Sequence, residues 1–313
     1  MINTSFLDNH DLILTTHPVI NGLPGENGNK SQPCLAGTML VNDKAGQQFL
    51  ANYYRNFIAV ARRTDVPIFL GSPTGHANRE SLTAANINHN INALAVRFLK
   101  YLRAEYNSWS ENIFIAGQVN CKNSCFRADQ ALSSRESVAF HAWQINKLDK
   151  EGVDLLVASQ LPSLQEAIGI ATAMAVTATP YVISFLLDKN GQLPDGTSLV
   201  EAFDEIDSLG LKPPVGYMVS CSDPSHLNIP QQPDIVMERL IGVQAWPSTC
   251  PGAIENLPAL DMKTWCRKMM FLNQHYSVNI MGDYPGTKTK YLQNLVAQLA
   301  TAKENTILRC ASL

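Results

Sequence analysis

The chain has 313 residues, of which 45% are hydrophobic and 16% are charged, and its formal net charge is −3. This balance is typical of a globular protein and excludes the strongly basic surface that follows a nucleic-acid backbone. No apolar run approaches the roughly 20 residues of a membrane-spanning helix, so we expect neither nucleic acid nor a membrane as a partner.

Two features of the sequence favour a cytoplasmic location. The N-terminal residues lack the basic start and the continuous apolar stretch of a secretory signal. The seven cysteines are an odd number and are scattered along the chain. Such a set favours free thiols in a reducing compartment over a disulfide framework, and most of them are expected to be small buried side chains.

Eight short apolar runs predict eight β-strands. They are apolar throughout instead of alternating, which is typical of strands covered on both faces. In chain order they lie at 12–17, 66–72, 113–119, 153–159, 180–187, 214–221, 240–246 and 276–283.

Amphipathic helices are predicted between these strands. The segment 49–63 places four apolar side chains on one face, and 80–103 repeats that pattern. A third helix is expected to open at Ser134 and to stop at Gly152, just before the next strand. The polar segment 21–46 is interpreted as a long loop after the first strand, and its part 21–30 as a lid over the site or a solvated loop.

Eight successive β-then-α units predict a single (β/α)₈ TIM barrel of the α/β class that spans residues 1–313. The alternative is an open, doubly wound sheet, which would need a glycine-rich phosphate turn after the first strand. The residues at that point are Thr15-Thr16-His17-Pro18, which do not form such a turn.

In this fold the chemistry gathers at the carboxyl ends of the strands. That rule selects candidate residues before any motif is consulted. They are Thr15 to His17, Thr74 to Asn78, Asn120, Cys121, Ser159, Gln160, Ser220 to Asp223, Trp246 to Cys250, and Gly282 to Tyr284.

Four motifs follow one another between about Phe49 and Leu292: PTGHAN, LQEAIGIA, PYVISFLLDKNGQLPDGTSL and YMVSCSDP. Taken together in this order, they resemble the homocysteine S-methyltransferase family. The run PTGHAN is similar to the family's P-T-W-R-A-N, and LQEAIGIA to its E-A-I-G-I-A helix. The segment PYVISFLLDKNGQLPDGTSL resembles its P-V-V-I-S-F strand with G-x-L-P-x-G-x-S-L, and YMVSCSDP resembles Y-M-I-N-C-x-H-P.

This resemblance implies methyl transfer from a sulfonium or ammonium donor to the thiol of homocysteine, giving methionine. In the family a zinc ion is held by three cysteine thiolates, one at the end of the sixth strand and an adjacent pair after the eighth. A free thiol has a pKa of about 8.5 and is mostly protonated at neutral pH, and metal coordination removes that proton.

The family's reactive residues are only partly retained. Cys221 stands at the first ligand position, but Asp283 and Tyr284 stand where the pair of cysteines is expected. The acidic residue that follows the first strand is replaced by Thr15 or Thr16, and the fourth strand ends in Ser159-Gln160. Ser220 replaces the asparagine before the cysteine, and Gly75-His76 replaces Trp-Arg.

These positions give the candidate site. Cys221 is the candidate catalytic residue and zinc ligand, with Asp283 and Cys250 as further ligands and His226 as an optional fourth. Thr15, Ser159, Gln160, Ser220 and Tyr284 are the candidate substrate-binding residues.

Structural interpretations of the same residues stay open. Cys221 can be a buried thiol, Asp283 can cap a helix that starts near Thr287, and Cys121 and Cys125 can be two loop thiols.

Three functions follow from this pattern. The first is a methyltransferase that acts on a small-molecule thiol and a methyl donor, with an altered zinc site. The second is a barrel without catalysis, or with a new role, that binds a small molecule or a protein at the same face. The third is a metal-free enzyme with Cys221 as nucleophile, which would need a base that the sequence does not identify.

Overall fold

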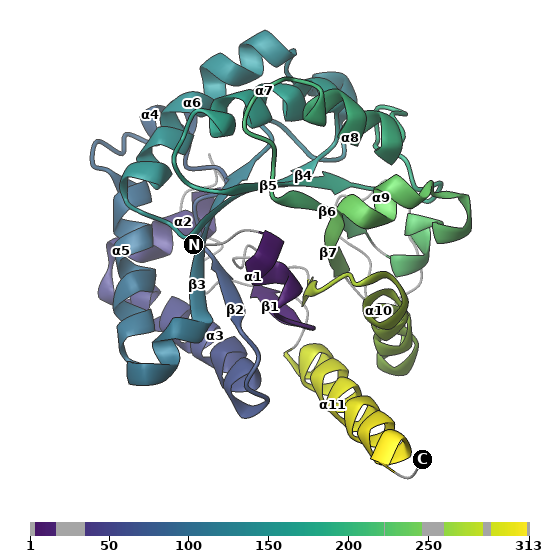
Figure 1. Cartoon of the computed structure of the whole chain (residues 1–313). Coiled ribbons are helices and arrows are strands. Elements are labelled where there is room, and N and C mark those ends of the chain that lie inside the picture. Colours follow the sequence, from purple (N-terminus) through teal and green to yellow (C-terminus); the bar gives the residue numbers. More distant parts are fainter. Residues whose placement is uncertain (1–3, 17–34, 222, 246–259, 284–288, 312–313) are drawn as a thin grey trace.

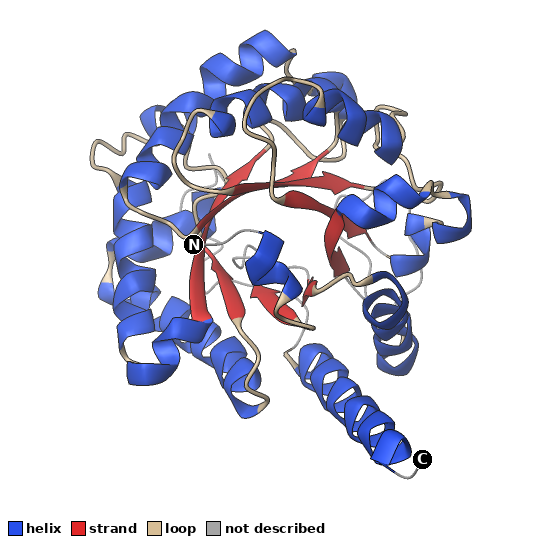
Figure 2. Cartoon of the chain, in the orientation of Figure 1, coloured by secondary structure: helices blue, strands red, loops and turns tan. Residues whose placement is uncertain are grey.

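The chain forms a closed barrel of parallel strands surrounded by helices (Figures 1 and 2). This computed structural model describes residues 4–16, 35–221, 223–245, 260–283 and 289–311. The strands follow one another around the barrel in sequence order, and β1 closes the ring by pairing with β8. The predicted TIM barrel is confirmed, and the open-sheet alternative is excluded. No helix in the described ranges is both long enough and apolar enough to cross a membrane.

All eight predicted strands are present, with small shifts at their ends. Within the described residues they are β1 (Ile13–Thr16), β2 (Ile68–Gly71), β3 (Ile113–Asn120), β4 (Leu155–Leu161), β5 (Tyr181–Leu186), β6 (Gly216–Cys221), β7 (Leu240–Ala245) and β8 (Ile280–Asp283).

The α-helices of the described ranges cover the outside of the barrel, apart from α1. They are α1 (Thr4–Asp8), α2 (Ala36–Met39), α3 (Lys44–Arg63), α4 (Arg79–Ala84), α5 (Ile91–Ala104), α6 (Ser134–Lys150), α7 (Leu164–Ala175), α8 (Leu199–Asp207), α9 (Asp234–Arg239), α10 (Met262–Tyr276) and α11 (Lys290–Ala311).

Two helix predictions need correction. The expected helix 80–103 is two helices, because Asn86 adopts a left-handed backbone (φ 56°) and Asn90 caps α5 through the N–H of Ala93. Helix α6 begins at Ser134 as predicted, and its N-cap Ser133 forms a capping box with Glu136.

The second correction concerns the predicted loop 21–46, whose end is helical. Helix α2, a 3₁₀ turn at Leu40–Asn42 and the start of α3 lie within it. The side chain of Asp43 accepts the N–H of Gly46 at 2.7 Å and so opens α3. Residues 21–30 lie outside the described residues.

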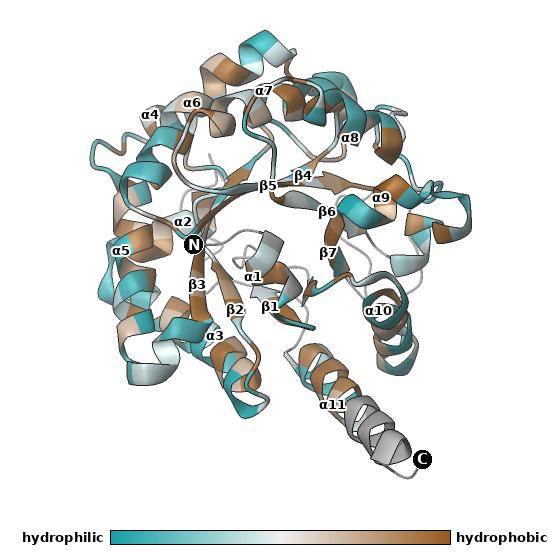
Figure 3. Ribbon diagram, viewed as in Figure 1, coloured by the Kyte–Doolittle hydropathy of each residue, from teal (hydrophilic) through white to brown (hydrophobic). Residues whose placement is uncertain are grey.

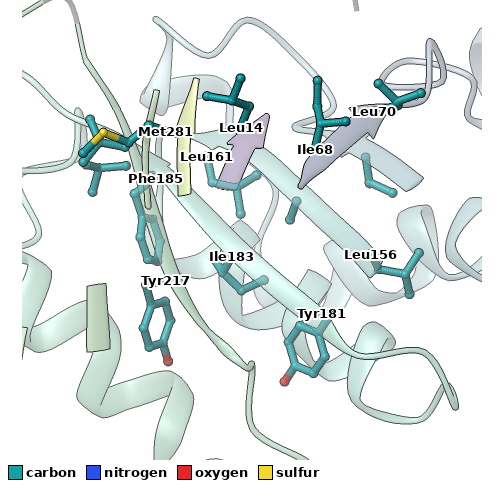
Figure 4. Close-up of a cluster of buried hydrophobic side chains, with 14 of the residues drawn as sticks. Leu14, Ile68, Leu70, Leu156, Leu161, Tyr181, Ile183, Phe185, Tyr217 and Met281 are labelled. Atoms are coloured by element: carbon teal, nitrogen blue, oxygen red, sulfur yellow. The ribbon is translucent and has the colours of Figure 1, made fainter. Parts of the chain in front are cut away.

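Alternate residues of each strand build two separate cores. One set faces the helices, as Figure 4 shows for Leu14, Ile183, Phe185 and Tyr217, and it joins the buried faces of the helices in one large cluster. The other set faces the barrel axis. It contains Ile13, Phe69, Ala116, Leu155, Val157, Val182, Met218 and Ile280. The strands are therefore covered on both sides, and most are hydrophobic along their length (Figure 3).

Helix α1 lies across the amino-terminal end of the barrel, in the centre of the ring in Figure 1. Leu7 belongs to the inner core. The ring of Phe6 packs edge-on against those of Phe69 and Phe114, with centroids 6.4 and 4.8 Å apart. The bottom of the barrel is filled by apolar side chains, so a small molecule has its natural place at the opposite end.

Candidate functional site at the mouth of the barrel

The interior changes from apolar to polar toward the carboxyl ends of the strands, which form the mouth of the barrel. Strand side chains alternate, so the residue two places after an inward apolar one also points inward. At these places Val157 is followed by Ser159 and Met218 by Ser220. The upper inner layer comprises buried, uncharged polar side chains: Thr15, Gln118, Asn120, Ser159, Ser184, Ser220 and Gln244.

Hydrogen bonds fix part of this layer. The hydroxyl of Ser159 donates to Oε1 of Gln118, and the backbone N–H of Gln118 donates to Oγ of Ser72 at 3.0 Å. The hydroxyls of Thr74 and Ser72 are hydrogen-bonded at 2.7 Å, and the Thr74 hydroxyl donates to the carbonyl oxygen of Gln118 at 2.9 Å. A satisfied network of this kind holds its members in one arrangement, which is what a binding surface requires.

In the side-chain amide of Asn120, the NH₂ group has a hydrogen-bond partner and the carbonyl oxygen has none. Its Nδ2 lies 3.3 Å from Nε2 of His76. The backbone N–H of Asn120 donates to the carbonyl oxygen of Gly75 at 2.9 Å. Burial lowers the pKa of His76, and the neighbouring His141 lowers it further, so the neutral ring accepts the amide hydrogen. Oδ1 of Asn120 is then directed elsewhere, and it is buried without a hydrogen-bond partner.

Gly75 stands where the similar motif has tryptophan, and this small residue explains how Asn120 reaches its position. A Cβ atom at residue 75 would lie 2.7 Å from Cγ of Asn120. The glycine therefore lets the amide fill space that a larger side chain would occupy. The sequence resembles a motif with tryptophan at this position, so the exchange reshapes this side of the mouth.

Gln160 lies beside Asn120 in an unusual backbone conformation. Its φ is 59°, and the pairing of β4 with β5 shifts register between Ala158 and Leu161. A non-glycine residue with positive φ is uncommon, and such residues cluster at functional sites. The Gln160 side chain is buried, and its Nε2 donor has no hydrogen-bond partner.

Cys221, the candidate ligand and nucleophile, is fully buried in the cluster that faces the helices. Burial raises the pKa of its thiol well above the ordinary value, and the carboxylate of Asp223 adds to the effect while Lys268 opposes it. Lys268 of α10 holds Asp223 at 2.6 and 2.7 Å. In this arrangement the thiol is protonated at neutral pH.

The proposed zinc ligands are not brought together within the described residues. No three His, Cys, Asp or Glu side chains there are placed to hold a metal ion. Cys250, Trp246 and Tyr284 lie outside those residues, and so does the side chain of Asp283, whose backbone pairs with Ala245. The described part of the site alone does not fit zinc, and the convergence of Cys221, Asp283 and Cys250 stays a prediction.

The remaining candidates divide between the mouth and its surroundings. Thr15 is buried in the polar layer, where a Cβ on Gly282 would touch its methyl group. Cys121 is buried and donates to the carbonyl oxygen of Asn123 at 3.2 Å. His226 lies in a 3₁₀ turn (Pro224–Leu227) after β6. Helix α11 begins at Lys290, and the side chain of Asp283 lies outside the described residues, so its role as a helix cap stays a prediction.

Sequence reasoning missed two groups of polar residues. Gln118, Ser184 and Gln244 could have been found as the polar members of otherwise apolar strands. The second group is a buried pair between helices, His141 of α6 and Glu166 of α7, whose Nε2 and Oε1 atoms are 2.9 Å apart. Each stands singly on an apolar helix face, and no sequence signal joins them.

Comparison with known proteins decides the family. A model of the homocysteine S-methyltransferase family matches residues 44–299. The chain belongs to this family. No curated protein sequence matches it. Among solved structures, the homocysteine methyltransferase MmuM from Escherichia coli in its metallated form is 17% identical with a TM-score of 0.69, and the match covers 94% of this chain and 98% of MmuM. The oxidized form is 16% identical with a TM-score of 0.64, covering 93% and 97%. At such identity the likeness shows the shared barrel.

Proposed function

We propose that this member of the homocysteine S-methyltransferase family transfers a methyl group from a sulfonium or ammonium donor to a small thiol, and that homocysteine is the first acceptor to test. The observation that carries the proposal is the buried polar layer at the mouth of a barrel of this family. The bottom of the barrel is filled, and the polar side chains lie at the end where barrels of this fold bind their substrates.

The reaction balances without a further reagent. The thiol sulfur forms a bond to the methyl carbon, the bond from that carbon to the donor's sulfonium sulfur breaks, and the thiol proton is released. The products are a thioether and the neutral sulfide of the donor. The chain's own part is to align the two sulfur atoms and to keep water out, and the fixed network of Ser159, Gln118 and Ser72 is suited to positioning.

Zinc remains part of the proposal as the group that would deprotonate the acceptor thiol. No step is assigned to it, because the described residues contribute one cysteine at the family's ligand positions and that thiol is buried among apolar side chains. A site with fewer thiolates would also bind zinc more weakly, since soft ligands favour this metal.

The test combines metal analysis with a methyl-transfer assay on protein purified without chelators. We expect a methylated thiol from S-methylmethionine and homocysteine or a simpler thiol, and loss of most of this activity in Cys221→Ala. Cys266→Ala is the matched control, because Cys266 is also fully buried in the outer cluster but lies on α10. No methylated product from any of these thiols, with or without added zinc, would overturn the proposal.

A second function is favoured by the state of Cys221. Its thiol is buried and its pKa is raised, so the ligand position kept from the family can serve packing alone. The barrel would then bind a small molecule at the polar mouth without methyl transfer. This binding protein shows no turnover at all, whereas the metal-free enzyme with Cys221 as nucleophile turns over without zinc and loses its activity in Cys221→Ala.

A further inference from the structure

Two buried carboxamides with complementary unsatisfied atoms come from the ends of the adjacent strands β3 and β4. Oδ1 of Asn120 is an acceptor without a donor, and Nε2 of Gln160 is a donor without an acceptor. The Cα of Asn120 pairs with that of Ser159 across β3 and β4, and Gln160 is the next residue. Ala158 and Leu161 both belong to the outer cluster, and the register shift between them leaves Ser159 and Gln160 for the side of the mouth. Neighbouring strands are about 4.8 Å apart, so we infer that one small group can reach both amides.

Both side chains are held in place by their surroundings. Asn120 and Gln160 are 7% and 5% exposed. Neutral His76 takes the Nδ2 hydrogen of Asn120, which fixes the orientation of that amide, and Gly75 leaves the room for it. Gln160 has a positive φ at the point where the pairing of β4 with β5 shifts register. Buried polar groups are normally hydrogen-bonded, so two unmet groups of complementary kind require an explanation.

Among the described residues, the charges beside the end of β3 are engaged with other partners. Lys122 forms an ion pair with Glu80 at 2.9 Å, and Glu166 is held by His141. The upper inner layer itself consists of hydroxyl and amide side chains. An ammonium or carboxylate brought into this position would lose its hydration without meeting an opposite charge from that part of the chain, which is costly.

We propose that Gln160 and Asn120 form a binding site for an uncharged group that both accepts and donates a hydrogen bond, a carboxamide being the best match. The carbonyl oxygen of that group accepts from Nε2 of Gln160, and its N–H donates to Oδ1 of Asn120. This inference rests on the proposed function for one point, that the ligand is a thiol. The proposed site limits the methyl acceptor to a thiol with a neutral polar head. Zwitterionic homocysteine fits such a site poorly.

The experiment compares three thiols of similar size in calorimetric titrations of the whole protein. They are 3-mercaptopropionamide, which is neutral, 3-mercaptopropionate, which is anionic, and cysteamine, which is cationic. We expect the amide to bind at least about tenfold more tightly than either charged thiol, the ratio that one unmet buried hydrogen bond produces. Equal binding of the three, or no binding of the amide, would overturn the proposal.

Isosteric variants test the two residues directly. Gln160→Glu replaces the free donor with a carboxylate. The variant should bind 3-mercaptopropionamide about tenfold more weakly and should prefer cysteamine. Asn120→Asp should shift the preference in the same direction. Thermal unfolding of each variant confirms the fold, and an unchanged order of affinities in folded Gln160→Glu contradicts the assignment. If the amide binds selectively but is never methylated, the proposed methyl transfer fails while the site stands.

Discussion

The buried pair of His141 and Glu166 offers the sharpest prediction about stability. Glu166 is fully buried, and its carboxylate accepts from Nε2 of His141 at 2.9 Å and from the N–H of Lys122 at 2.7 Å. It also accepts the N–H of Leu132 at 3.4 Å. The side chain therefore ties both ends of the segment between β3 and α6 to helix α7.

The variant Glu166→Ala leaves these donors buried without their acceptor. Removing one partner of a buried pair costs about 3–5 kcal/mol, and each unmet donor accounts for about 1–3 kcal/mol of it. We expect the midpoint of thermal unfolding, followed by circular dichroism, to fall by roughly 5–8 °C for a chain of this size. Glu166→Gln keeps one acceptor oxygen and should lose clearly less.

The control is Asp129→Asn, which breaks an exposed ion pair with Arg127 and should leave the unfolding midpoint unchanged. The reasoning is refuted if Glu166→Ala lowers the free energy of unfolding by less than about 1 kcal/mol, the size of an ordinary surface effect. It is equally refuted if the control variant loses as much as Glu166→Ala.

Three further predictions follow from individual contacts. Ser133→Ala removes the capping box with Glu136 and should cost about 0.5–2 kcal/mol in urea unfolding, with a smaller loss for Ser133→Gly as the check. Burial lowers the pKa of folded His76, so its stabilising contribution is full above about pH 6.5 and is lost as the pH falls through the lowered pKa. Unfolding measured between about pH 7.5 and 5 should therefore show a shallower decline in His76→Asn, and parallel curves would contradict this. Native protein should protect Cys221 from a thiol reagent while partly exposed Cys125 reacts, and peptide mapping that finds Cys221 labelled at the same rate would disprove its burial.

The strands could be predicted from sequence because parallel strands covered on both faces are continuous apolar runs. The ends of helices were harder, since they depend on single residues. The break between α4 and α5 follows from the left-handed Asn86 and the cap at Asn90, and asparagine alone does not reveal either role. Helix α2 was missed because four residues are too few to show a period.

The sequence predicted the place of the candidate site better than the contacts within it. The rule of strand ends found Ser159, Gln160, Asn120 and Ser220 at the mouth. It could not foresee which atoms lack partners, because that depends on contacts between strands such as the one between Asn120 and His76. Nor could it foresee the environment of Cys221, where burial and Asp223 raise the pKa of the thiol and Lys268 of the distant helix α10 opposes them.

The alternation along β6 bears on how the chemistry of this family can change without loss of the fold. Tyr217 and Val219 face the helices, and Met218 and Ser220 face the axis. Residues of the first kind maintain the barrel, while Ser220 belongs to the polar layer at the mouth and lies 3.4 Å from the hydroxyl of Ser184. Cys221 belongs to the packed set in this chain, so its presence is explained by the fold as well as by metal binding. Loss of activity in Cys221→Ala therefore counts as evidence for chemistry only when the variant and Cys266→Ala unfold at the same temperature, since a cavity in the outer core would impair both alike.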